Sequence, residues 1–355
     1  MRGLALEGGG AKGAYHIGVA KALFEKGYTF DGFVGTSIGA INAAMMVQGD
    51  FDKAIESWMD ITIGKIFDED SRRTIIEEHI SEDKIRRSGK DFGLVTVSLS
   101  DLKPYELTLE DIPKGQLVNY VMASASLPIF GPETIEDKMF LDGAFYNNCP
   151  VNLLLDKGYD EVIAVRTYAF GIFHKTEDPR VKLISPHSDL GNMMNFTREG
   201  IAANIKLGYY DGLRFAENLL GRSYYIRPVD VAVFDTKLMS IPDEVIRETG
   251  KILGIHEIPA KRMLFEKIIP QLSTHIKLGK YFDYEDFIIA LIEYTAEQRE
   301  LDYFRIYDYA EICSLIKQTP RPEKRKEPRA VAKLISGSGL TKKKTALRLL
   351  AESLL

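Results

Sequence analysis

A serine between two glycines, in residues 35–39, is the first group in this sequence that could carry out chemistry. The segment reads Gly-Thr-Ser-Ile-Gly, the pattern G-x-S-x-G, with Ser37 at its centre. Apolar residues 30–34 before it suit a strand, and small and apolar residues 40–47 after it suit a helix. A serine on a sharp strand-to-helix turn projects its hydroxyl clear of the sheet. The pattern therefore predicts a nucleophile elbow, although in a chain with 29 glycines it also arises as an ordinary turn.

A second glycine-rich segment, residues 8–13, lies between an expected first strand at residues 3–7 and an expected helix at residues 14–26. Acyl transfer needs hydrogen-bond donors aimed at the oxyanion of the tetrahedral intermediate, and consecutive backbone N–H groups ahead of a helix can supply them. We interpret the segment as an oxyanion loop beside the elbow. Its candidate residues are Gly8, Gly9, Gly10, Lys12 and Gly13.

The same glycines also satisfy G-x-G-x-x-G, the fingerprint of dinucleotide-binding proteins. That fingerprint expects an acidic residue at the end of the second strand, where this chain has the elbow itself. Asp31 lies before that strand, at its other end, and the G-x-x-x-x-G-K-[ST] phosphate loop is absent from the sequence. A nicotinamide-binding protein is therefore the more distant alternative, and we expect neither a cofactor nor a metal.

A serine nucleophile needs a base, and the expected base is Asp142 rather than a histidine. Asp142 ends a short expected strand at residues 139–141 and precedes Gly143, and none of the six histidines stands in such a context. His16, one turn into the first helix, is expected to be structural. Burial near an apolar pocket raises the pKa of a carboxyl group and makes it a better base. An ordinary Asp-Gly turn is the structural alternative.

The elements that would position these residues alternate along the chain. Expected strands are separated by helices, which predicts an α/β fold with a mostly parallel sheet and helices on both faces. From about residue 188 the pattern is helical, apart from a last expected strand at residues 223–227. Further helices are expected at residues 242–253, 259–269, 284–300 and 305–317.

Three blocks together resemble the patatin-like phospholipases. They are the glycine loop, with Lys12 where the family commonly has Arg, the elbow from Gly35 to Gly39, and Asp142-Gly143-Ala144 with Asn148 following. Their order and spacing make the resemblance specific, and it covers residues 1 to about 215. It implies a three-layer α/β/α fold, a Ser37–Asp142 dyad without histidine, an oxyanion hole at Gly9, Gly10 and their neighbours, and hydrolysis of lipid acyl esters.

The charges are unevenly distributed along the chain. The net charge is −5, yet residues 317–355 hold 11 Lys and Arg against 3 Asp and Glu. The prolines and charges of residues 319–328 indicate a linker. The pattern of residues 341–355 predicts a short basic amphipathic helix. We therefore expect a catalytic domain at residues 1–229, a helical region at 230–318, and a basic linker and tail at 319–355. The tail is either a solvated end or a contact for an anionic membrane surface.

The setting expected from composition is cytoplasmic, with peripheral membrane contact left open. Cys149 and Cys313 have neither metal-ligand nor disulfide spacing, and no apolar run approaches the roughly 20 residues of a membrane span. Residues 1–7 reach an acidic residue too early for a signal peptide. A nucleic-acid partner is not indicated, and homo-oligomerisation is left open.

The sequence thus favours a lipid acyl hydrolase of phospholipase A type. Two alternatives remain: a soluble carboxylesterase or thioesterase that uses the same site, and a protein that binds a regulator or partner through its helical region. Preference for vesicles over short soluble esters would separate the first alternative from a lipid hydrolase.

Overall fold

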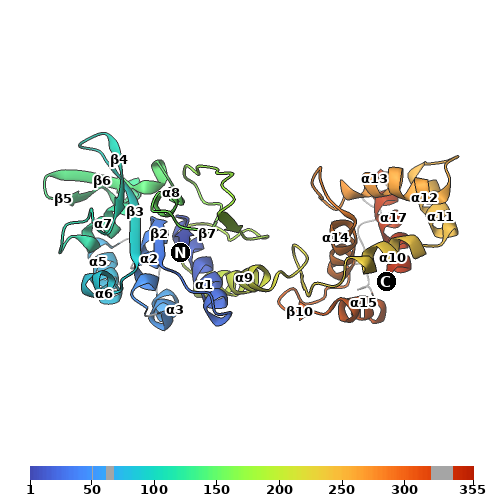
Figure 1. Cartoon of the computed structure of the whole chain (residues 1–355), viewed down its shortest axis with the longest axis horizontal. Helices are drawn as coiled ribbons and strands as arrows, with labels where there is room; N and C mark the ends of the chain where they lie inside the picture. Colours follow the sequence, from blue (N-terminus) through green and yellow to red (C-terminus); the bar gives the residue numbers. More distant parts are fainter. Residues whose placement is uncertain (50, 61–67, 321–338) are drawn as a thin grey trace, which may run out of the picture. The chain divides into compact units, whose positions relative to one another are not determined.

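The chain folds into two compact units, Met1–Ala216 and Glu217–Leu355. The computed structural model, drawn in Figure 1, describes residues 1–49, 51–60, 68–320 and 339–355. The expected boundary after residue 229 moves to Glu217, because the segment that follows contributes strand β9 (Tyr225–Ile226) to the second unit. Most of the expected linker at residues 319–328 lies outside the described residues.

The first unit is built on a sheet that has eight strands within the described part of the chain, in the order β5-β6-β3-β2-β1-β7-β8, with β4 also paired to β3. Neighbours along β3-β2-β1-β7-β8 are parallel, whereas β4 and β6 run antiparallel to β3. The expected α/β class with a mostly parallel sheet is confirmed. The strands are β1 (Arg2–Leu6), β2 (Gly32–Thr36), β3 (Asp91–Ser98), β4 (Lys103–Thr108), β5 (Glu133–Ile135), β6 (Lys138–Asp142), β7 (Glu161–Val165) and β8 (Val181–Ile184).

Strands β2 and β6 share one edge of the long strand β3. Strand β2 pairs with residues 91–95 of β3, and β6 pairs with residues 96–98. Strand β4 pairs with residues 93–98 and so overlaps both of them. Because a strand has only two edges, β4 takes one edge and β2 and β6 follow each other along the other. Their carboxyl ends meet there, Thr36 opposite Val95 and Asp142 opposite Thr96.

Helices cover both faces of this sheet. Val34 packs with the cluster that contains Leu153 and Leu154 of α8 (Asn152–Leu155), whereas the next residue, Gly35, lies against α2 (Ile38–Val47). Because successive strand residues point to opposite faces, α2 and α8 lie on opposite sides of the sheet. The other helices of this unit are α1 (Ala14–Glu25), α3 (Phe51–Asp60), α5 (Glu69–His79), α6 (Glu82–Arg87), α7 (Leu117–Ser124) and α9 (Arg198–Glu217).

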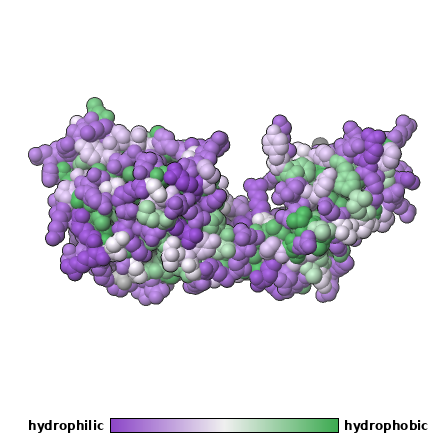
Figure 2. Space-filling model, viewed as in Figure 1, coloured by the Kyte–Doolittle hydropathy of each residue, from purple (hydrophilic) through white to green (hydrophobic). Residues whose placement is uncertain are grey.

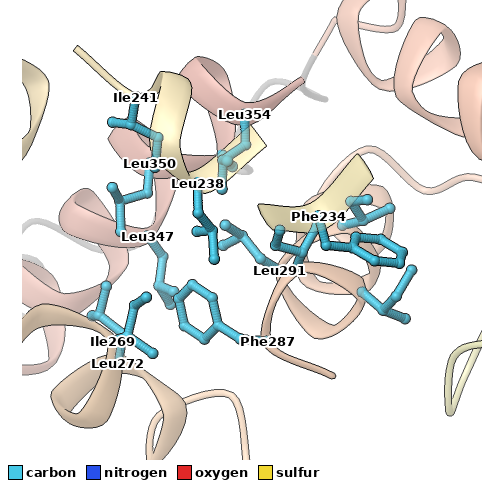
Figure 3. Close-up of a cluster of buried hydrophobic side chains, with 14 of the residues drawn as sticks. Phe234, Leu238, Ile241, Ile269, Leu272, Phe287, Leu291, Leu347, Leu350 and Leu354 are labelled. Atoms are coloured by element: carbon cyan, nitrogen blue, oxygen red, sulfur yellow. The ribbon is translucent and has the colours of Figure 1, made fainter. Parts of the chain in front are cut away.

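The second unit is helical around one apolar core. Its helices are α10 (Ala232–Ser240), α11 (Asp243–Leu253), α12 (Ala260–Met263), a π turn (Leu264–Ile268), α13 (Ile269–Ser273), α14 (Tyr284–Glu297), α15 (Tyr309–Gln318) and α17 (Gly339–Leu354). Figure 3 shows Leu347 and Leu350 of α17 in the same cluster as Phe287 of α14 and Leu238 of α10. The expected amphipathic tail helix is therefore part of this core, because its leucine face packs against the other helices.

Three further expectations change. The helix expected from residue 188 begins at Arg198. The helix expected from residue 305 begins at Tyr309, because Ile306–Tyr307 form strand β10, parallel to β9. Strand β8 was not expected.

Over the described ranges, every helix is too short or too polar to cross a bilayer. On the face drawn in Figure 2, hydrophilic residues cover most of the surface and hydrophobic ones form small patches.

Candidate active site

Ser37 stands on a sharp turn between β2 and α2. Its backbone angles, φ 57° and ψ −130°, are rare for a residue with a side chain, as the expected elbow requires. The turn is held by its neighbours: Ser37 N–H donates to Ser124 Oγ (3.0 Å), and Thr36 Oγ1 donates to the carbonyl of Asn147 (2.7 Å). Ser124 Oγ in turn donates to Val95 O of β3 (2.7 Å). The elbow is thus fixed to the centre of the sheet.

Asp142 lies beside Ser37 because β2 and β6 end next to each other along β3. It is fully buried, and its Oδ1 accepts a hydrogen bond from Ala144 N–H (2.8 Å). Burial raises the pKa of Asp142 to about 7, and hydrogen bonding from Ser37 and Ala144 limits the rise. Oδ2 is buried and makes no further hydrogen bond of normal geometry in the described part of the chain. The pair therefore has the residue types and the proton affinity that a serine–carboxylate dyad needs.

The glycine loop leaves two N–H groups available. Gly8 N–H donates to Asn148 O (3.0 Å), Ala11 N–H to Met193 O (2.7 Å), and Lys12 N–H to Gly9 O (3.2 Å). For Gly9 and Gly10 no such bond is made within the described residues. Both have positive φ, 154° and 56°, which turns the backbone away from the strand. Among Gly8, Gly9, Gly10 and Lys12, the N–H groups of Gly9 and Gly10 are therefore the ones that these bonds leave unengaged.

The loop is adjacent to the elbow. A Cβ atom on Gly8 would lie 3.1 Å from Ser37 Cβ, and one on Gly13 would lie 2.7 Å from the side chain of Ile38. Side chains at these positions would push the two segments apart. The structure thus brings the three sequence blocks together at the carboxyl ends of strands β1, β2 and β6.

His16 belongs to a buried network that reaches the glycine loop through the carbonyl of Gly13. Its Nδ1 lies 3.2 Å from Asn42 Nδ2, Asn42 also donates to Gly13 O, and Trp58 Nε1 donates to Asn42 Oδ1 (2.9 Å). Burial lowers the pKa of His16 to about 3, so the ring is neutral near pH 7. The network ties together α1, α2 and α3, as a structural histidine would.

An apolar cleft opens next to the elbow. It encloses about 630 Å³, including its open mouth. Ile38, which follows Ser37, lines it, as does Ser126, whose carbonyl accepts the N–H of Asp142. The remaining lining residues come from α2, α3, α5 and α7 or directly follow them: Ile41, Met45, Ser57, Trp58, Arg72, Ile75, Ile76, His79, Ile80, Met122 and Ala125.

The part of the chain that contains these residues is similar to a known protein family. A family model described as patatin-like phospholipase matches residues 4–155, which include the glycine loop, Ser37 and Asp142. Residues 4–155 are a patatin-like phospholipase domain. The resemblance drawn from the sequence is confirmed. The matched domain supports a lipid hydrolase in general.

Several relatives match 46% of this chain. Neuropathy target esterase sws of Drosophila melanogaster is 30% identical over 191 residues, 12% of its length. Patatin-like phospholipase domain-containing protein 6 of Homo sapiens is 27% identical over 188 residues, 13% of its length. An uncharacterised NTE family protein of Mycobacterium tuberculosis is 28% identical over 177 residues, 48% of its length. The chain thus matches less than half of each of these relatives.

The solved structures that align with the chain include VipD from Legionella pneumophila. Its TM-score is 0.46 at 12% sequence identity, over 100% of this chain and 90% of that chain.

A buried carboxylate that was not expected from the sequence anchors the patatin-like domain's glycine loop. Glu7, fully buried, accepts hydrogen bonds from the N–H groups of Thr167 and Tyr168 and forms an ion pair with Arg166 (2.9 Å). Thr167 Oγ1 also donates to Gly8 O (2.6 Å). The segment after β7 therefore holds the loop in place. In the sequence, an acidic residue directly before a glycine run was the one available signal.

Asn148 is a second buried neighbour of the loop. Its backbone carbonyl accepts from Gly8, and its N–H donates to Ile172 O (2.7 Å). A Cβ atom on Gly8 would lie 2.3 Å from Asn148 Oδ1, so glycine is required there. The sequence marked Asn148 only through the family resemblance.

Proposed function

We propose that this chain is a lipid acyl hydrolase of phospholipase A type, with Ser37 and Asp142 as its catalytic dyad. One observation carries the proposal: β2 and β6 end beside each other along β3, so the elbow serine and a buried carboxylate are neighbours. A histidine is not required, because burial raises the pKa of Asp142 to about 7, near that of a free imidazole.

In the proposed reaction, Ser37 Oγ attacks the ester carbonyl while Asp142 takes the hydroxyl proton. The tetrahedral intermediate then collapses, the C–O bond to the alcohol breaks, and Asp142 returns the proton to the leaving alkoxide. Water attacks the acyl-serine with Asp142 again acting as base, and the fatty acid is released with Ser37 restored. Each half-reaction uses the same proton-transfer pair.

The oxyanion would be stabilised by backbone N–H groups that donate to no other acceptor among the described residues. Gly9 and Gly10 are the candidates, since neither donates to an acceptor among the described residues. The N-terminus of α2, which begins at Ile38, adds the positive end of a helix dipole. Preorganised donors of this kind typically contribute about 2.7–4 kcal/mol each to transition-state stabilisation.

The apolar cleft favours an acyl chain over a small soluble ester. It begins at Ile38, directly beside the nucleophile, and most of its lining residues are Ile, Met, Ala or Trp. An acyl chain bound there would gain about 0.8 kcal/mol for each buried CH₂ group. A short ester would gain little binding free energy from the cleft. If the chain is a carboxylesterase instead, its activity should not depend on the length of the acyl chain.

The proposal is tested with a panel of phospholipids and of short soluble esters. Wild type should release fatty acid and react with a serine-directed phosphonate, whereas Ser37→Ala should do neither and keep the wild-type melting temperature. Ser88→Ala, which removes a structural hydroxyl, is the matched control and should stay active. Lipid hydrolysis that survives Ser37→Ala would overturn the assignment. Activity restricted to short soluble esters would favour the alternative.

A further inference from the structure

Two exposed phenylalanines pack against each other in the loops that follow the carboxyl ends of β6 and β7 in the first unit. Phe145 and Phe170 are 39% and 72% exposed, and their rings pack edge to face with centroids 6.1 Å apart. They come from different loops, one after β6 and one after β7. Ile172, 50% exposed, follows in the second loop. We name these three residues the aromatic rim. Apolar side chains that are exposed singly are normal on a protein surface. Adjacent ones form a patch, and such patches mark sites of contact with a partner.

The rim is held in place by backbone hydrogen bonds between the two loops. Ile172 N–H donates to Ala144 O (2.9 Å), and Ile172 O accepts from Asn148 N–H (2.7 Å). His174 packs on Tyr146 at 5.7 Å between ring centroids, with its Nε2 2.9 Å from Tyr146 O. The exposed rings are therefore presented by an ordered scaffold.

The rim borders the proposed catalytic groups. Phe145 lies three residues after Asp142, within the turn whose Ala144 N–H binds the carboxylate. Phe170 follows Ala169, whose Cβ would lie 3.0 Å from a Cβ on Gly9. A surface in contact with the rim would thus be next to both the base and the oxyanion loop.

Two lysines lie next to the rim. Lys12, in the glycine loop, has its Cβ 3.4 Å from the position that a Cβ on Gly9 would take, and Lys175 is exposed directly after His174. Neither lysine forms an ion pair with another described residue. In the same loop Glu177 is exposed, and Asp178 forms an ion pair with Arg180 (2.6 Å). Aromatic rings flanked by lysines complement the interface of an anionic bilayer.

We propose that the aromatic rim is the surface through which this protein docks on a lipid bilayer. The inference rests on the proposed function, because a lipid hydrolase must draw its substrate out of a membrane. The leucine face of the basic tail is not available to insert into a bilayer, since Leu347, Leu350 and Leu354 of α17 are buried in the core of the second unit. Docking through the rim would bring the lipid ester to Ser37 and its acyl chain to the cleft.

The test measures vesicle binding by the full chain carrying Ser37→Ala, so that binding is read without turnover. Phosphatidylcholine vesicles with and without phosphatidylserine are the probes. In this background, Phe170→Ser should weaken binding roughly tenfold, and adding Phe145→Ser should weaken it roughly tenfold more, as removing such side chains from an apolar contact predicts. Lys175→Gln should weaken binding about fivefold on the anionic vesicles alone.

Leu183→Ser is the matched control. Leu183 is 54% exposed but lies within β8, not in the loops beyond the strand ends, and its substitution should leave binding unchanged. Melting temperatures establish that all variants fold. Unchanged vesicle binding by the double phenylalanine variant would overturn the inference. If that variant instead lowers the mass of the protein in solution, the rim is a contact between copies of the chain. Loss of hydrolysis bears on Ser37 and Asp142 and leaves this binding result intact.

Discussion

A Cβ atom on Gly39 would lie 2.2 Å from the carbonyl oxygen of Leu6. Gly39 is in the first turn of α2, and Leu6 ends β1, shortly before the glycine loop. The helix therefore crosses the strand at backbone distance. This close approach sets the height of Ser37 above the sheet relative to Gly9 and Gly10.

Gly39→Ala should therefore disrupt both the fold and the site. Backbone atoms cannot move aside as a flexible side chain can, so α2 must shift away from β1. Overpacking in a core typically lowers the free energy of unfolding by about 1–3 kcal/mol. Because the clash here is with backbone, we expect a loss at or above the upper end of that range. Chemical denaturation measures the loss. Gly279→Ala is the control, because the nearest atom to an added Cβ there is 3.9 Å away, and it should change stability by less than about 0.5 kcal/mol.

The pH dependence of hydrolysis should reveal the base. Asp142 must be ionised to accept the proton of Ser37, and burial raises its pKa to about 7. The value of kcat/KM should therefore rise about tenfold for each pH unit below about 7 and level off above it. A soluble ester assayed across this range gives the profile. A profile that stays flat down to about pH 5 would indicate a carboxylate with an ordinary pKa near 3.9.

The same pKa predicts that the site destabilises the protein at high pH. The native carboxyl holds its proton up to about pH 7, whereas in the unfolded chain it releases it near its ordinary value of 3.8. The folded state thus binds more protons between these values, and its stability falls as pH rises through this window. Asp142→Asn removes the buried charge. It should raise the unfolding free energy above pH 7, by at most roughly 4 kcal/mol, while abolishing hydrolysis.

Urea titrations of wild type and Asp142→Asn at acidic and alkaline pH measure this effect. The difference between the two proteins should shrink as the pH approaches 4, where native Asp142 is protonated. An advantage of the Asn variant that is equal at both pH values would mean that the carboxylate carries no burial cost.

The residues of the candidate site could be picked out from the sequence because they lie in short motifs. The turn at Ser37, the glycine run and the Asp-Gly end of β6 each appear in a few consecutive residues. The supports were not predictable. Ser37 N–H is held by Ser124, 87 positions away, and Glu7 binds Thr167, 160 positions away. Such contacts arise from the strand order, which local patterns do not specify.

The C-terminal helix is a second example of what local sequence patterns do not specify. Its leucine spacing predicted an amphipathic helix, and residues 339–354 are helical. Amphipathicity indicates that one face is covered but not what covers it, and the basic composition pointed to a membrane. In the structure, buried residues of α10, α13 and α14 belong to the same core as these leucines.

Leu350→Ala should therefore destabilise the second unit. Leu350 is fully buried in that core, and removing a buried leucine typically costs about 2–5 kcal/mol. Lys344→Ala changes an exposed residue of the same helix and is the matched control, with an expected effect below about 0.5 kcal/mol. Hydrogen exchange reports on the two units separately. In Leu350→Ala, the protection of backbone amides should fall in α10, α11 and α14, whereas amides of the sheet around Ser37 should stay as protected as in wild type. If both variants instead leave exchange unchanged and only weaken binding to anionic vesicles, α17 is a membrane-binding helix after all. That outcome would also count against the aromatic rim as the main contact.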